Sequence, residues 1–384
     1  MKRDLILIAL ALFIWGAGEG LFYYLQPVYL EALGASPLLI GAILGGYGAA
    51  MTIAHIPAGY IADRFGRRPL MWASWLLGVL AAVMMAVAPG LPAFVAGLLI
   101  YGLTMFVLTP MNSYITAARG RWSVGRALTL VSAMFNLGMV IGSLFSGWTA
   151  ERFGMPSIFA AAAGLFSVST VLIFFIRPQP VEAAVVGTRR LDFIRSPRHQ
   201  RYLGVVFLAA FSAYLALPLS QNFLAIERGL TLGTVGALTA LTGVGVAALN
   251  FLLGFLDARW GFLLAQAAVG GFALIMWQGA ALPWYALAYF LMGGYKTARS
   301  LMTAHTRELV SAHSMGLAYG VTETTGALAT IAAPVLAGAL YARTPVWVYP
   351  VAFALILVSM IVSARFFTRP ALTPALESHT PPAD

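Results

Sequence analysis

The sequence contains no cysteine and few charged residues. Of its 384 residues, 9% are charged and only 13 are acidic, whereas 60% are apolar. The absence of cysteine excludes disulfides, a thiol nucleophile and a thiolate metal site. Soluble domains carry roughly 25% charged residues, so this chain could not cover a soluble surface. The composition therefore predicts a polytopic membrane protein.

The sequence also lacks a concentrated basic patch. Its net charge is +10, but Lys and Arg are spread thinly between apolar runs. Nucleic acids are bound by clustered basic residues with interleaved aromatics, so no nucleic-acid partner is expected. The first apolar run, from Leu5 to about Leu30, is too long for a secretory signal, and we interpret it as a spanning helix.

Twelve apolar runs are long enough to cross a membrane, which needs about 20 residues. Six precede a polar stretch and six follow it. The expected spans are 5–32, 37–62, 69–88, 92–117, 125–150, 156–177, 202–226, 231–256, 260–280, 283–306, 314–341 and 345–367. The sequence thus predicts an all-α membrane protein.

The polar stretch divides the predicted helices into two bundles of six. We expect residues 1–177 to form the first bundle and residues 201–369 the second. Residues 178–200 are expected to be a cytoplasmic linker, in which Leu191–Ile194 suit a short amphipathic surface helix. The Pro- and Thr-rich residues 370–384 are expected to be a disordered tail.

The distribution of positive charge predicts the orientation. With both termini in the cytoplasm, 18 of the 23 Lys and Arg residues lie on the cytoplasmic side and three lie outside. Cytoplasmic loops of membrane proteins are enriched in these residues. We therefore expect both termini inside, in a multi-pass protein of the cell inner (cytoplasmic) membrane.

Internal repeats relate the two halves. Residues 59–66 (GYIADRFG) close the second run, and residues 254–261 (GFLDARWG) close the eighth at an offset of 195. A third copy, residues 147–154 (GWTAERFG), follows the fifth run on the opposite face of the membrane. This pattern predicts a tandem duplication with an inverted three-helix repeat nested within each half.

The loop after the second run resembles the signature loop of the major facilitator superfamily. It carries the pattern Gly59, Asp63, Arg64, Gly66, Arg67 and Arg68. With twelve helices in two halves, the resemblance covers nearly the whole chain. It implies a secondary active transporter that works by alternating access, a central cavity lined by helices one, four, seven and ten, and a conformational latch formed by these loop residues.

Two other signatures of that family are absent. No Arg occurs between Pro92 and Ala118, where the proton-coupled branch carries a buried Arg in the fourth helix. The fifth run has glycines but no Gly-Pro pair of the kind seen in the antiporter branch. Both departures argue against a simple drug/proton antiporter.

Four ionisable residues fall within predicted spans, namely Glu19, Lys296, Arg299 and Glu323. Such residues are costly in a membrane and indicate function. Glu19 lies about 22 Å along a helix from Asp4, near the midplane, and Lys296 is about 20 Å deep from the other side. We expect Glu19 and Glu323 to couple protons, although Glu19 could instead be a packed carboxyl, and Lys296 could instead form a structural ion pair. Arg299 and Glu323 have similar depths, so we also expect a salt bridge between them.

Helical phase predicts which side chains line the cavity. In the tenth helix, Tyr289, Met292, Lys296 and Arg299 fall on one stripe. At the repeat offset of 191, Lys296 corresponds to Met105, so this cation occurs in only one half. The expected substrate-binding residues are Lys296, Arg299, Tyr23, Gln26, Tyr101, Asn112, Tyr214, Gln221 and Asn222.

The sequence therefore predicts a proton-coupled transporter of a small organic, anionic or amphiphilic solute, with sodium as the alternative ion. A multidrug or lipid efflux pump for neutral compounds is the alternative within the same class, and a non-transporting receptor is the alternative from another class. No catalytic constellation is apparent, so an enzyme is not expected. Neither a cofactor nor a metal is expected, and the partners are the substrate, the coupling ion and the lipid bilayer around a monomer.

Overall fold

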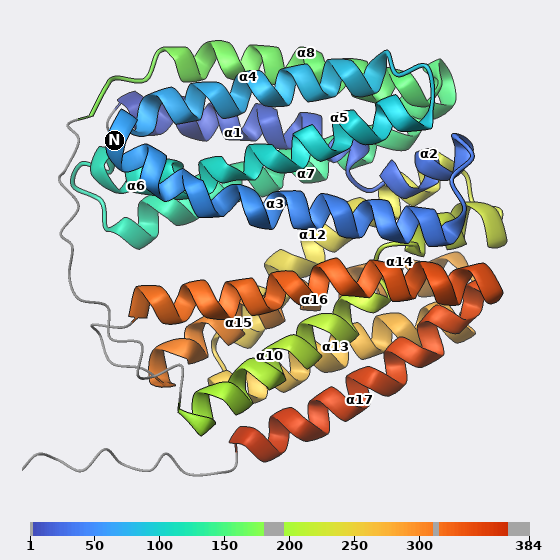
Figure 1. The fold of residues 1–384 in the computed structure, drawn as a ribbon. Helices are drawn as coiled ribbons and strands as arrows, with labels where there is room; N and C mark the ends of the chain where they lie inside the picture. Colours follow the sequence, from blue (N-terminus) through green and yellow to red (C-terminus); the bar gives the residue numbers. More distant parts are fainter. Residues whose placement is uncertain (1–2, 180–195, 310–314, 368–384) are drawn as a thin grey trace, which may run out of the picture.

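A computed structural model of the protein describes residues 3–179, 196–309 and 315–367. These ranges form helices and contain no β-strand. The helices lie lengthwise beside one another in two groups, α1 to α8 and α10 to α17 (Figure 1). The all-α fold with two groups of spanning helices is as predicted. The expected surface helix at Leu191–Ile194 and the tail 370–384 lie outside the described residues.

The first half contains eight α-helices and one 3-10 turn. They are α1 (Arg3–Phe22), α2 (Gln26–Ala32), α3 (Pro37–Phe65), α4 (Arg67–Ala86), α5 (Leu91–Leu103), the 3-10 turn Thr104–Val107, α6 (Leu108–Ala118), α7 (Val124–Phe153) and α8 (Met155–Phe174). The described part of the second half follows the same plan. It contains α10 (Pro197–Leu215), α11 (Ser220–Asn222), the π-helical turn Phe223–Glu227, α12 (Leu232–Gly254), α13 (Ala258–Gln278), α14 (Leu282–Met292), α15 (Gly294–Leu309), α16 (Met315–Arg343), the 3-10 turn Pro345–Trp347 and α17 (Val348–Phe367).

Within the described residues, 11 helical segments are long and apolar enough to cross a membrane. They correspond to predicted spans one to nine, eleven and twelve. The tenth predicted span, residues 283–306, forms α14 and α15 and is divided at Gly293. Its second part carries both Lys296 and Arg299, so the least apolar span is the one that bears the cations.

Four spans that were predicted as continuous helices are interrupted. The first breaks between α1 and α2, the fourth at the 3-10 turn, the seventh between α10 and α11, and the tenth at Gly293. The predicted stripe from Tyr289 to Arg299 crosses the last of these breaks, but Met292 and Lys296, one on each side of Gly293, still line the same cavity.

The interruptions have local causes. Three of them have a proline nearby: Pro27 and Pro110 lie just after the first and second breaks, and Pro218 lies within the third. A proline ring clashes with the carbonyl four residues earlier and removes one backbone donor. At the fourth break, Gly293 and Gly294 are adjacent, and glycine is a poor helix former. The interrupted spans are the first, fourth, seventh and tenth, the ones that the family resemblance assigns to the cavity.

The two copies of the repeat motif after α3 and α7 share a backbone geometry. Gly66 has φ 84° and ψ 162°, and Gly154 has φ 84° and ψ 157°. Only glycine adopts such a conformation without steric cost. Each glycine allows the next helix to begin immediately, which agrees with a nested repeat in the first half.

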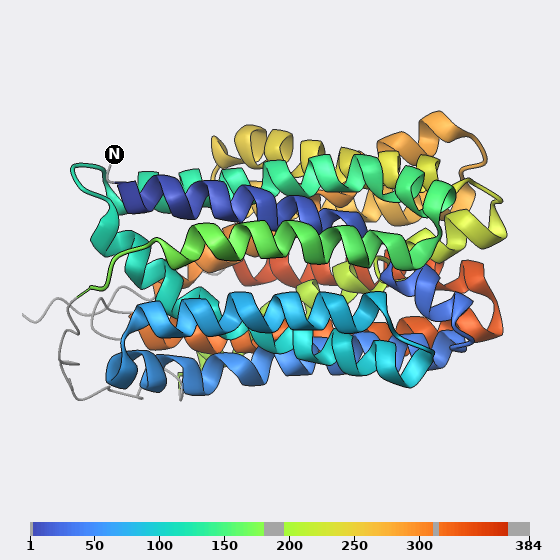
Figure 2. The same cartoon turned by 90° about the horizontal axis from the view of Figure 1, so that it is seen from above.

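The described helix contacts between the halves run from one end of the molecule to its middle. One end of the molecule holds the start of α1 and the last residues of α17, together with Arg67, Arg119 and Arg365, and we call it the basic end (Figures 1 and 2). We call the other end of the molecule the opposite end. At the opposite end α3 packs on α16 and α7 packs on α12. A Cβ atom on Gly147 of α7 would lie 1.9 Å from the carbonyl oxygen of Leu232, so this glycine permits backbone contact between the halves.

Candidate functional site

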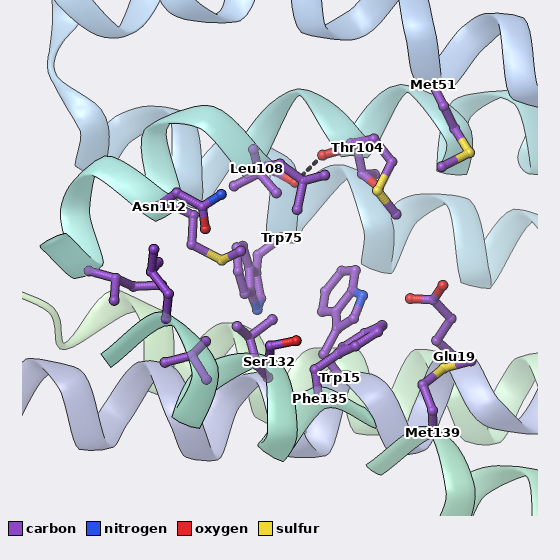
Figure 3. Close-up of a pocket in the computed structure, with 18 of the residues that line it drawn as sticks. Trp15, Glu19, Met51, Trp75, Thr104, Leu108, Asn112, Ser132, Phe135 and Met139 are labelled. Carbon is purple, nitrogen blue, oxygen red and sulfur yellow. Dashed lines mark hydrogen bonds between the residues drawn. The ribbon is translucent and has the colours of Figure 1, made fainter. Parts of the chain in front are cut away.

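A cavity of about 520 Å³ extends from the middle of the protein toward the basic end. Of its 21 lining residues, 20 come from the first half and one, Lys296, comes from the second. Glu19 lies toward one end of this central cavity and Asn112 toward the other, with Trp15, Trp75 and Phe135 between them (Figure 3).

The walls of the central cavity are mainly aromatic and methionine side chains. Trp15 stacks on Phe166 with ring centroids 3.9 Å apart and contacts Trp75 at 5.3 Å. The Trp75 indole donates a hydrogen bond of 2.8 Å to Ser169 Oγ, which fixes the ring. Four methionines also line the cavity, namely Met51, Met105, Met111 and Met139. Flexible, polarisable methionines adapt to apolar guests of different shape.

Glu19 is a buried carboxylate near the end of α1. Only 5% of the residue is exposed, yet it lines the central cavity. The Tyr101 hydroxyl donates a hydrogen bond of 2.8 Å to Glu19 Oε2, and the Trp15 indole is also within hydrogen-bonding range. Tyr101 is itself fully buried and stacks parallel to Phe166 at 5.8 Å. The aromatic cluster therefore holds the carboxylate in place.

Lys296 is the cation that faces this carboxylate from the other half. It lies in the first turn of α15, just after the break at Gly293, and its side chain is exposed to the cavity. The two charges interact electrostatically. The structure thus brings together Glu19 and Lys296, the two deepest charges predicted from the sequence, at the boundary between the halves.

A second, smaller cavity of about 100 Å³ lies beside the first, and we call it the outer cavity. It is lined by six residues of the first half and eight of the second, and it shares Tyr23, Tyr47 and Lys296 with the central cavity. Tyr23 and Tyr214 are within hydrogen-bonding range of each other across the halves. The predicted residues Tyr23, Gln26, Tyr214 and Gln221 all line this cavity.

Two predicted substrate-binding residues have other contacts. The Asn222 amide donates to the Pro27 carbonyl at 3.0 Å and to Glu31 Oε2 at 2.5 Å, joining the two halves at the opposite end. Asn222 is not among the residues that line the two cavities. Tyr101 binds Glu19 but does not itself line either cavity, so it is a positioning residue.

Arg299 and Glu323 form the expected salt bridge. Arg299 Nη2 lies 2.5 Å from Glu323 Oε2, and Arg299 Nε donates to the same oxygen at 3.2 Å. Both residues line a separate pocket of about 20 Å³ between α10, α15 and α16. The pair therefore lines a different pocket from Glu19 and Lys296, although Arg299 lies one helical turn from Lys296 and interacts with it electrostatically.

The predicted latch is described only in part. The side chains of Gly59, Asp63 and Arg64 lie outside the described residues. Arg67 donates to Gln179 Oε1 at 3.1 Å, and Arg68 donates to the Phe174 carbonyl at 3.3 Å. These two hydrogen bonds tie the start of α4 to the end of α8 and to the first residues of the predicted linker.

Some lining residues were missed by the sequence analysis. Tyr47 and Met51 come from α3, and Phe135 and Met139 come from α7. Both helices belong to spans two and five, which the family resemblance does not assign to the cavity. The only sequence signal was the one-turn spacing in each pair, which an apolar membrane helix also shows on its lipid-facing side.

The helices and cavities define a class, a multi-pass membrane protein that can enclose a small molecule between two halves. Residues 8–203 match the Major Facilitator Superfamily. A transporter of the same type from Methanocaldococcus jannaschii, itself uncharacterised, is 24% identical over 279 residues, covering 69% of this chain and 71% of that protein. The quinolone resistance protein NorA of Staphylococcus aureus is 22% identical, covering 89% of this chain and 90% of NorA.

The solved structures agree with the fold. The crystal structure of the nucleoside transporter NupG superposes with a TM-score of 0.77 at 14% identity, covering 95% of this chain and 98% of NupG. The chain belongs to the major facilitator superfamily. It is therefore a membrane transport protein and not an enzyme.

Proposed function

We propose that this protein is a proton-coupled transporter of small organic anions with a large apolar part. Lys296 attracts the anionic group, the aromatic and methionine walls hold the apolar part, and Glu19 carries the proton. The observation that carries the proposal is the placement of Glu19 and Lys296, one from each half, at the same end of the central cavity.

The arrangement supports coupling because one cation has two competing partners. When Glu19 is ionised, it neutralises Lys296 and weakens the attraction for an anion. When Glu19 is protonated, Lys296 is available to a ligand in the cavity. Anion and proton therefore favour each other's binding, and linkage makes this effect reciprocal. The pair then crosses the membrane with no net charge.

The orientation follows from the positive charges. We propose that the basic end faces the cytoplasm of a cell whose inner membrane holds the protein, as a monomer. The contacts of α3 with α16 and of α7 with α12 then close the outer side, and the central cavity extends toward the cytoplasm. Rocking of the two halves about the site would expose it to the other side.

The test uses purified protein in liposomes and a panel of radiolabelled aromatic and aliphatic carboxylates. Lys296→Met copies the corresponding residue of the first half, Met105, and is expected to abolish uptake of the anions. Lys296→Arg keeps the charge and serves as the matched control, with uptake retained in part. Equal uptake by the wild type and Lys296→Met would refute the anion site.

A second candidate function is efflux of neutral lipophilic compounds. The apolar walls around Trp15, Trp75 and Phe135 favour it, and NorA is named for resistance to quinolones. Under this function Glu19 still couples the proton but Lys296 only balances its charge. Transport of neutral aromatic compounds that survives Lys296→Met would support this second function over the first.

A further inference from the structure

The outer cavity is lined by two residues whose hydrogen-bonding groups have no partner among the described residues. Gln26 is 2% exposed, and its Nε2 is buried without an acceptor. Tyr47 is 6% exposed, and its hydroxyl is also unpartnered. Both side chains line the outer cavity. A buried donor without an acceptor costs free energy, so a ligand that brings an acceptor to these groups gains from satisfying them.

The charge of the outer cavity has one sign. Lys296 is its cation, and no carboxylate is among its 14 lining residues. Glu19 lies on the central side of the boundary formed by Tyr23, Tyr47 and Lys296. Gln26, Tyr47 and Lys296 all line this space of about 100 Å³.

We propose that the outer cavity is the subsite for the anionic head group of an amphipathic ligand whose apolar body lies in the central cavity. A carboxylate accepts several hydrogen bonds at once, which matches the unpartnered donors. The central cavity, about five times larger, supplies the apolar walls. The inference rests on the proposed function and adds to it which part of the substrate lies where.

The subsite also connects binding to conformation. The central cavity is formed almost entirely by the first half, whereas the outer cavity is formed by both halves. A ligand held only by its apolar body would contact mainly one half. A head group in the outer cavity touches Gln26 on one side and Lys296 on the other, so it binds more tightly when the two halves are together.

The test compares three probes that share one apolar body, namely naphthylacetate, naphthylethanol and naphthylethylamine. Their dissociation constants are measured by quenching of tryptophan fluorescence, since Trp15 and Trp75 line the central cavity. Gln26→Met removes the donor at nearly constant volume. Its matched control is Asn250→Leu, which removes an exposed amide of α12 that lines neither cavity.

The wild type is expected to prefer the carboxylate over the alcohol and the amine. Gln26→Met should weaken naphthylacetate binding by about tenfold, the effect of one hydrogen bond to a charged group, and leave naphthylethanol unchanged. Asn250→Leu should not change the preference for the carboxylate. Melting temperatures without ligand identify any variant that does not fold. A second variant, Gln26→Glu, places a negative charge beside the anionic head group and should abolish the preference for the carboxylate probe.

Two results would overturn the subsite. One is that naphthylacetate binds equally well to the wild type and to both Gln26 variants, while Lys296→Met still loses anion transport. The outer cavity would then hold only water, and the proposed function would stand. The other is equal weakening of all three probes by Gln26→Met, which would make Gln26 a packing residue. If every variant, including Lys296→Met, kept its preference for the anion, the result would count against the proposed function itself.

Discussion

Lys296 and Met105 occupy corresponding positions in the two halves, yet only one is charged. Met105 lines the central cavity from the first half, so the scaffold accepts an apolar side chain at this position. A cation at the membrane midplane is costly unless it has a use. The electrostatic interaction with Glu19 of the other half supplies such a use for Lys296. The site is therefore asymmetric, although the two halves have nearly the same fold.

Tyr101 is expected to act through Glu19. Tyr101→Phe removes the 2.8 Å hydrogen bond and keeps the ring stacked on Phe166. We expect proton-driven uptake in liposomes to fall about tenfold to a hundredfold, because a hydrogen bond to a charged group contributes about 1.5–3 kcal/mol. Exchange of labelled for unlabelled substrate, which needs no net proton movement, should be unchanged. If both activities fell together, Tyr101 would have only a structural role.

Arg299 and Glu323 are expected to act as a structural pair. Their side chains are 53% and 42% exposed, and exposed ion pairs contribute little, so we expect a coupling energy of about 0.2–1 kcal/mol. The measurement is a double-mutant cycle of Arg299→Ala and Glu323→Ala on stability in detergent. Anion affinity should survive in the double variant. Its loss there, with the fold intact, would place Arg299 in the substrate site.

At the scale of helices, the number and limits of the spans could be predicted because the bilayer sets their length. Predicted spans 37–62 and 345–367 lie within a few residues of α3 and of the 3-10 turn with α17. The interruptions at Leu25, Ala216 and Gly293 could not be predicted. Proline and glycine also occur in continuous membrane helices, so the sequence alone does not distinguish a break from a kink.

The candidate site shows the same limit. Glu19 and Lys296 were predicted because ionisable residues are rare within apolar spans. Tyr47 and Met51 were missed because α3 is apolar on all sides, and hydrophobic periodicity then carries no directional signal. Asn222 was predicted from its helix and its type, but which neighbour its amide meets depends on the close approach of Pro27 and Glu31 from the other half.

The contact between α7 and α12 is expected to control closure of the opposite end. Gly147 lies against Leu232, and four residues later Glu151 Oε1 accepts a hydrogen bond of 2.7 Å from the Gly233 backbone N–H near the start of α12. A carboxylate is stabilised at a helix N-terminus. This is the third copy of the repeat motif, and here the acidic residue reaches across to the other half.

Gly147→Val should therefore open the opposite end, since its side chain would overlap the Leu232 carbonyl. The measurement is a spin-label distance between the introduced cysteines Ser36→Cys and Thr344→Cys, which lie on different halves at that end. We expect most of the population to shift to longer distances. The matched control is Gly164→Val, where a side chain meets nothing within 4 Å. An unchanged distance in Gly147→Val would show that this contact does not hold the end closed.

At the scale of the whole molecule, the absence of cysteine becomes useful. The chain has no native thiol, so pairs of labels can be introduced at either end without background. Arg121→Cys with Leu256→Cys reports on the basic end, as the pair above reports on the opposite end. Alternating access predicts that the two distances change in opposite senses when a ligand or a more acidic pH shifts the equilibrium between states. A change of the same sign at both ends would mean that the halves separate without rocking.

The central claim is that Glu19 and an organic anion compete for Lys296, so that anion and proton bind together. Calorimetry of naphthylacetate binding in buffers of different ionisation enthalpy measures the protons exchanged per ligand. At a pH where Glu19 is ionised, the wild type should take up protons on binding, approaching one per anion, and Glu19→Gln should take up none. Anion binding by the wild type without proton uptake, or the same uptake in Glu19→Gln, would contradict the account.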